Sequence, residues 1–219
     1  MATMPIRKTS ESIQSTGKVK VADGVRDLIL YEILDEATEP PTYGKVYEFK
    51  GLLRQITSTS SVTTQEIAGD NVTQLVITNT ADTTGTLQLV DFPIELKNIV
   101  TGDYEDANGV TVPNLGDKPK FGMSAIRTFS NGVRSGRAYY KIQFGDLTGI
   151  NATTREKGTI NPQFVDVPWT GFIVSIGGGM DKPYLEVITD NPKYTQGFLE
   201  TWRTSFPTLN LATPPPQVI

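Results

Sequence analysis

The side chains that carry out most enzyme chemistry are absent from this sequence of 219 residues, which contains no Cys and no His. Without Cys the chain has no thiolate nucleophile, no thiolate zinc ligand and no disulfide. Without His it lacks the commonest general base and metal ligand, and it has no Ser-His-Asp triad. Chemistry by two facing carboxylates remains open, but the sequence identifies no such pair. We therefore expect a protein that is not an enzyme and that uses no cofactor and no metal.

Basic and aromatic residues lie close together within residues 118–157, a pattern that raises nucleic-acid binding. The basic residues include Arg127, Arg134, Arg137 and Lys141, and Phe129 lies among them. Bases would stack on rings that share one surface, but Tyr139 and Tyr140 are consecutive in a predicted strand and point to opposite faces. The formal charge of −4 also disfavours tight binding of phosphates. We expect no specific nucleic-acid site.

The glycine run Gly177–Gly179 is the segment closest to a phosphate-binding loop. Such a loop needs a Gly-Lys-Ser/Thr sequence and a following helix whose N-terminus faces the anion. The next element, residues 184–188, is predicted to be a strand instead. We interpret the glycines as the turn of a hairpin between strands 170–176 and 184–188.

Alternating apolar residues predict a mainly β fold of antiparallel strands, arranged as a β-sandwich or partial barrel. The run 25–34 fits either a buried strand or a helix face, and we choose the strand. Residues 46–56 read as one strand, and further strands are predicted at 75–79 and 86–92 and on both sides of the Asn131-Gly132 turn. One face of the strand before this turn is expected to hold Phe121, Met123, Ala125 and Phe129, and one face of the strand after it Ala138, Tyr140, Ile142 and Phe144.

One short helix is expected to flank the sheet, at about residues 92–101. Pro93 suits the first turn of a helix, and Gly102 suits its exit. The apolar face of this helix, which would cover the sheet, consists of Leu96, Ile99 and Val100.

The segment 57–66 is polar on both sides. Its Thr and Val residues favour a strand, but it has almost no apolar face, so a core alone cannot hold it. It reads either as a solvated loop or as part of an extended hairpin of about residues 54–78 that turns near Gly69-Asp70-Asn71. We favour the hairpin, because long loops without secondary structure are uncommon in compact domains.

The β domain is expected at residues 25–192, between two terminal arms. Residues 1–24 are polar and basic, and they read as a disordered tail or as an arm that orders on a neighbouring subunit. Residues 193–219 are expected to form a short helix and then a stiff, Pro-rich arm. The helix would dock Phe198, Trp202 and Phe206 on the body. The candidate contact residues of the two arms are Arg7, Lys8, Lys18, Lys20, Pro214, Pro215 and Pro216.

Charge is segregated along the chain. The net charge is +3 over residues 7–20, −5 over 23–48, −5 over 91–117 and +6 over 118–157. Alternating blocks suit a head-to-tail assembly, in which opposite charges steer and register the contact between copies. A solvated exterior without this role is the alternative interpretation.

Residues 92–174 contain an ordered series of helix, turn and strand motifs. The series begins with FPIELKNIVTG and the acidic loop DYEDANGV, in which Asn108-Gly109 predicts a hairpin turn. It continues with KFGMSAIRTFSNGVRSGRAYYKIQFGDL and ends with TTREKGTINPQFVDVPWTGFIV. The last segment carries the Lys-Gly, Pro, Phe, Thr-Gly order of Gly158, Pro162, Phe164 and Gly171. This series resembles the major tail tube protein of long-tailed (siphovirus-type) bacteriophages, and weaker similarity extends upstream to about Gly24.

The resemblance implies a structural virion protein that is made in the cytoplasm of a bacterial host and located in the viral tail. Subunits of this family form hexameric rings that stack into a tube for DNA ejection, with a β-sandwich-like fold and a helix on its flank. The implied partners are other copies of the chain, other tail proteins at the tube ends, and a tape measure protein and transiting viral DNA that the lumen does not bind specifically. No membrane contact is implied.

The resemblance also suggests roles for the polar hairpin and the arms. Residues 54–78 and part of 121–147 would line the lumen, with more acidic than basic groups on its wall. The candidate inter-ring or lumen residues are Thr57, Thr59, Thr63, Gln65, Glu66 and Asp70. The two arms are candidate inter-subunit contacts. They also depart from the family pattern, because a long basic N-terminal arm and a Pro-rich end are not typical of its compact members.

A β-sandwich carbohydrate-binding or phage adhesion module is the alternative function. Such a module needs a row of exposed aromatic residues on one sheet face. Trp169, beside Pro168, is the only residue from which the sequence could build that row.

Overall fold

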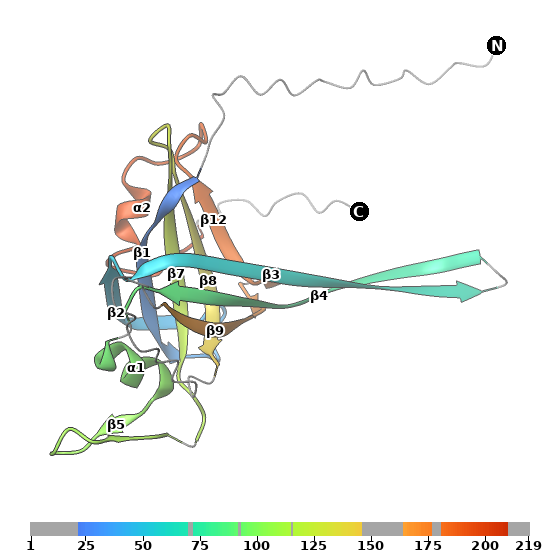
Figure 1. The fold of residues 1–219 in the computed structure, drawn as a ribbon. Coiled ribbons are helices and arrows are strands. Elements are labelled where there is room, and N and C mark those ends of the chain that lie inside the picture. Colours follow the sequence, from blue (N-terminus) through green and yellow to red (C-terminus); the bar gives the residue numbers. More distant parts are fainter. Residues whose placement is uncertain are drawn as a thin grey trace, which may run out of the picture.

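The computed structural model describes residues 22–69, 72–91, 93–114, 116–145, 164–176 and 181–209. These residues form a mainly β protein with antiparallel sheets, as predicted (Figure 1). The strands are β1 (Ala22–Asp35), β2 (Thr42–Lys50), β3 (Leu53–Gly69), β4 (Val72–Leu89), β5 (Tyr104–Glu105), β6 (Thr111–Val112), β7 (Lys120–Phe129), β8 (Arg134–Phe144), β9 (Val165–Phe172), β10 (Val174–Ser175), β11 (Asp181–Lys182) and β12 (Tyr184–Ile188). The helices are α1 (Ile94–Thr101) and α2 (Phe198–Thr201).

The main sheet is curled into a partial barrel. Its strand order is β2-β1-β7-β8-β9-β4-β3, and β12 pairs with β8 beside this path. β2 and β3 therefore stand at opposite ends of the order, although only Gly51 and Leu52 separate them in the chain. Because two residues cannot span a flat sheet of this width, the two ends must approach each other. Gly51 makes this corner with a positive φ of 71°.

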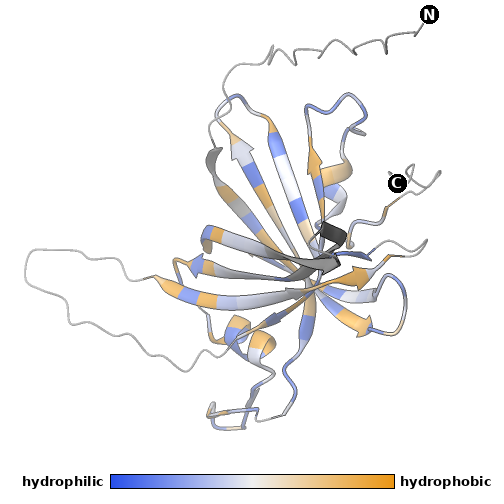
Figure 2. Ribbon diagram, turned by 90° about the vertical axis from the view of Figure 1, so that its right-hand side faces the viewer, coloured by the Kyte–Doolittle hydropathy of each residue, from blue (hydrophilic) through white to orange (hydrophobic). Residues whose placement is uncertain are grey.

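Apolar side chains on both faces of β1 are buried. Leu28 and Leu30 belong to an inner cluster enclosed by the curled sheet, whereas Ile29 and Tyr31 belong to an outer cluster. The inner cluster also contains Leu53, Leu87, Leu89, Phe121, Met123, Tyr139, Ile142 and Trp169, and the outer one contains Ile126, Ala138, Tyr140, Val174, Leu199, Trp202 and Phe206. Burial on both sides explains why the four consecutive residues 28–31 are all apolar or aromatic. Figure 2 shows hydrophobic and hydrophilic residues alternating along other strands of the body.

The helix α1 agrees with its prediction. Pro93 is its N-cap, and Gly102 ends it in the left-handed conformation with φ of 73°. Leu96 and Val100 are buried in the inner cluster, and Ile99 packs against it. The Asn108-Gly109 and Asn131-Gly132 turns are also confirmed, since they join β5 to β6 and β7 to β8.

The C-terminal aromatic residues dock on the outer cluster, as predicted. Trp202 and Phe206 are buried there, and Phe198 packs against them. The Phe206 ring stacks on Tyr43 at a centroid distance of 4.1 Å. The hydroxyl of Tyr31 donates a hydrogen bond of 2.6 Å to the carbonyl of Trp202. Trp202 is thus a packing anchor of the body.

Three strand predictions were wrong in detail. Residues 46–56 are two strands, because the chain turns at Gly51. The separate strands at 75–79 and 86–92 are parts of the single strand β4. The hairpin joining 170–176 to 184–188 is instead a short β10–β11 pair, and β12 pairs with β8.

The predicted face of β8 was also wrong. Ala138 and Tyr140 lie in the outer cluster, but Ile142 and Phe144 lie in the inner one. The cause is a register shift, since Phe121 faces Ile142 whereas Met123 faces Tyr139. One extra residue on β8 forms a bulge there and reverses the alternation of faces. At this point the neighbour of β8 changes from β12 to β9.

Candidate functional site

The β3–β4 hairpin extends beyond the body as a two-stranded ribbon (Figure 1). Its pairing runs from Leu53 opposite Leu89 to Gly69 opposite Val72, so the turn lies at the predicted position and the hairpin is longer than expected. β4 also pairs with β9, but only from Thr83 to Leu89. Among the described strands, the part of β4 before Thr83 pairs with β3 alone.

The base of the hairpin is fitted closely to the body. A Cβ atom added at Gly85 would lie 2.2 Å from the carbonyl oxygen of Thr57 and 2.4 Å from the ring of Trp169. No real side chain fits such distances, so glycine is needed where β3 and β4 pass over the indole. The Ser60 and Thr83 hydroxyls form a hydrogen bond of 2.8 Å across the two strands at this point.

The predicted contact residues of the hairpin lie along β3. Thr57 and Thr59 are exposed at its base. Thr63, Gln65 and Glu66 occupy its outer part, and their side chains, like the whole of Asp70, lie outside the described residues. The structure therefore places five of the six predicted residues on β3, and among these it describes the side chains of Thr57 and Thr59.

Unpaired strand edges are the main chemical feature of this region. β3 is the last strand of the sheet, and among the described residues β4 is its only partner over the whole span Leu53–Gly69. An open edge presents N–H and C=O groups that pair readily with another strand. A two-stranded ribbon on its own is also only marginally stable in water. Both properties favour pairing or packing with a second chain.

The two predicted arms lie outside the described residues. They comprise Arg7, Lys8, Lys18 and Lys20 before β1, and Pro214, Pro215 and Pro216 after Leu209.

Five basic residues of the segment 118–157 form ion pairs within the described part of the chain. The Nζ of Lys120 lies 3.0 Å from a carboxylate oxygen of Glu36, and Arg134 contacts Glu200. Arg127 and Arg137 approach the two carboxylate oxygens of Glu186 at 3.3 and 3.0 Å. Lys141 and Glu36 form a longer pair of 3.7 Å.

These pairs change the interpretation of the charge blocks. Much of the basic segment is neutralised by acidic residues of β12, α2 and the segment after β1, so it is not wholly available to a second copy. Arg203 is paired in the same way, with Asp27 at 2.6 Å and Glu48 at 3.2 Å. Sequence reasoning missed Glu186 and Glu200, because nothing local marks them as partners of residues about 50 positions or more away.

The aromatic residues do not form an exposed platform in the described part of the chain. Tyr139 and Tyr140 are buried in opposite clusters, as their positions on the strand predicted. Trp169 is only 2 % exposed, so the residue on which the carbohydrate-binding alternative depended lies inside the inner cluster. Tyr104 is the one aromatic residue among the exposed large hydrophobics of the described ranges.

The described residues offer neither a metal site nor a membrane-spanning helix. No group of three or more carboxylate side chains is arranged there to hold a metal ion. No helix there is long and apolar enough to cross a membrane.

Models of known protein families and curated proteins yield no match to this chain.

Proposed function

We propose that this chain is a structural subunit that assembles with copies of itself into stacked rings, as the major tube protein of a phage tail. The observation that carries the proposal is the β3–β4 hairpin, a long ribbon whose strand β3 pairs with β4 alone among the described residues. Copies joined through such edges would remove them, which is the advantage of closing a sheet into a barrel. The order of motifs over residues 92–174 supports the same assignment.

In this proposal the rings are hexameric, and the tube is the passage for viral DNA in the virion tail. The hairpin and part of residues 121–147 supply the lumen strands. Intramolecular pairing of Arg134, Arg137 and Lys141 with carboxylates supports a wall with little free positive charge. Such a wall leaves passing DNA mobile, because affinity for phosphates comes from unpaired Lys and Arg. Other tail proteins and a tape measure protein would meet the tube at its ends and in its lumen.

Electron microscopy of the purified protein tests the proposal. At high concentration the full chain is expected to form rings or tubes with a bore. A variant in which Asn-Gly replaces residues 61–82 keeps the base of the hairpin, since Ser60 and Thr83 face each other, and should remain a folded monomer.

A matched control shortens the other projecting hairpin by placing Asn-Gly between Tyr104 and Val112, which are also paired. This control should still assemble. A full chain that stays monomeric at high concentration would reject the proposal. Tubes formed by the variant without residues 61–82, or loss of assembly in both shortened proteins, would reject the specific role of the β3–β4 hairpin.

A further inference from the structure

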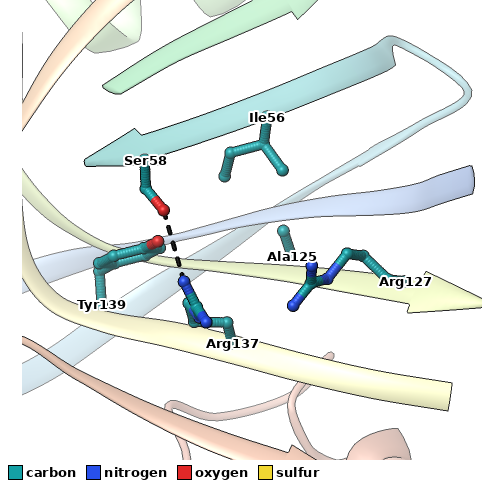
Figure 3. A pocket seen from close by; sticks show the side chains of 6 residues that line it. All are labelled: Ile56, Ser58, Ala125, Arg127, Arg137 and Tyr139. Atoms are coloured by element: carbon teal, nitrogen blue, oxygen red, sulfur yellow. Dashed lines mark hydrogen bonds between the residues drawn. The ribbon is translucent and has the colours of Figure 1, made fainter. Parts of the chain in front are cut away.

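A small cavity lies where β3 crosses over β7 and β8 (Figure 3). Its volume is about 40 Å³. β3 contributes Ile56 and Ser58, β7 contributes Ala125 and Arg127, and β8 contributes Arg137 and Tyr139. The short side chain of Ala125 provides part of the space, because longer residues at this position of β7 would fill it.

The cavity is lined by more positive than negative charge. Arg127 and Arg137 share the single carboxylate of Glu186. This ratio is the reverse of that at Arg203, which contacts the two carboxylates of Asp27 and Glu48. Two guanidinium groups beside one carboxylate leave one net positive charge in a partly enclosed space.

Hydrogen-bond donors accompany this charge. The Nε of Arg137 is buried and has no hydrogen-bond partner among the described residues. Arg137 also donates a bond of 3.4 Å to the Ser58 hydroxyl, and its guanidinium carbon lies 4.4 Å from the centre of the Tyr184 ring. Burial acts to lower the pKa of Arg137, but hydrogen bonds with Tyr139 and Glu186 act in the opposite direction and outweigh it. The pKa is raised overall, so the guanidinium stays charged. A buried donor without a partner is costly unless a ligand or solvent satisfies it.

The size of the cavity restricts its ligand. A water molecule needs about 10–15 Å³ of such volume, so the cavity has room for about three water molecules or for one small anion. The two arginines are reachable from solvent, since 37 % and 26 % of their side-chain surfaces are exposed.

We propose that this cavity binds a small monovalent anion, with chloride as the natural occupant, between Arg127, Arg137 and the Ser58 hydroxyl. The anion balances the excess guanidinium charge and links the base of β3 to β7 and β8. Its binding concerns the isolated subunit and does not depend on the assembly proposed above.

Chloride titration of the monomeric protein tests the site. The 35Cl NMR line should broaden with protein present, and replacing gluconate by chloride at constant ionic strength, from about 30 to 300 mM, should raise Tm by about 2–4 °C. Arg127→Gln removes the excess charge, so it should weaken chloride binding by about tenfold or more. Ala125→Val fills the cavity and should abolish the broadening.

Arg134→Gln is the matched control. It removes an arginine that is paired with Glu200 at another place on the same sheet, so chloride binding should be unchanged. The proposal is overturned if the natural protein shows no chloride-specific broadening, if either cavity variant retains it, or if Arg134→Gln loses it. A cavity variant that fails to fold leaves the decision to the other one.

Discussion

The body and the β3–β4 hairpin use the same kind of strand in opposite ways. In the body both faces of β1 are buried, and each central strand has a neighbour on both edges. In the outer hairpin, over residues 61–69 and 72–81, the strands pair only with each other among the described residues. The body therefore holds its own structure, whereas the hairpin has the properties of a part that is completed by another chain.

Hydrogen exchange should show the largest contrast between the two regions. In the isolated subunit, amides of the outer hairpin should open with a free energy lower than those of β1 and β7 by about 5 kcal/mol or more, because among the described residues the two strands of the outer hairpin pair only with each other. Mass spectrometry of the subunit below its assembly concentration measures this difference. Equal protection of the two regions would contradict the comparison, and protection gained on assembly would extend it.

Trp202→Ala should have the largest effect of the single substitutions. The side chain is 1 % exposed, and its loss should lower the free energy of unfolding by about 3–5 kcal/mol. Urea unfolding measures the change. Tyr104→Ala is the control, because 62 % of that side chain is exposed and the cost should stay within about 0.5 kcal/mol.

Gly85→Ala tests the contact between the regions. The added methyl group meets the Thr57 carbonyl and the Trp169 ring, so the free energy of unfolding should fall by about 1–3 kcal/mol. Thr84→Ala, at the exposed neighbouring position of β4, should cost much less. Equal effects in urea unfolding would show that the hairpin base is not tightly fitted to the body.

The smallest effect concerns the surface pair of Arg134 and Glu200. The hydrogen bond from Arg134 holds the pKa of Glu200 below its ordinary value of 4.5. Because the folded-state pKa is lowered, the pair contributes stability above pH 4.5, and this contribution is lost as the pH falls through the lower folded value. Arg134→Gln should thus cost about 0.2–1 kcal/mol at pH 7 and nearly nothing in strong acid, as measured by urea unfolding at both pH values. A cost that does not vary with pH would exclude this pair as its cause.

Local signals predicted the turns and the helix, because Pro93, Gly102 and the two Asn-Gly pairs act on their immediate neighbours. The antiparallel β class and the turn of the long hairpin were predicted for the same reason. Long-range features were not predictable in this way. The bulge that moves Ile142 to the inner cluster, the burial of Trp169 and the pairing of Arg137 with Glu186 depend on which strands become neighbours.

The corner at Gly51 also has a consequence for the order of folding. β2 and β3 follow each other in the chain, but the strands that lie between them in the sheet come largely from later residues, and Ala22 of β1 must find Phe129 of β7. Pairings between residues so far apart form slowly, whereas a hairpin brings together residues that are close in sequence. On a growing chain β3 and β4 have each other as partners before β7, β8 and β9 exist. The part of the molecule with least support from the body can therefore take shape before the later strands of the body, as can the β1–β2 pair.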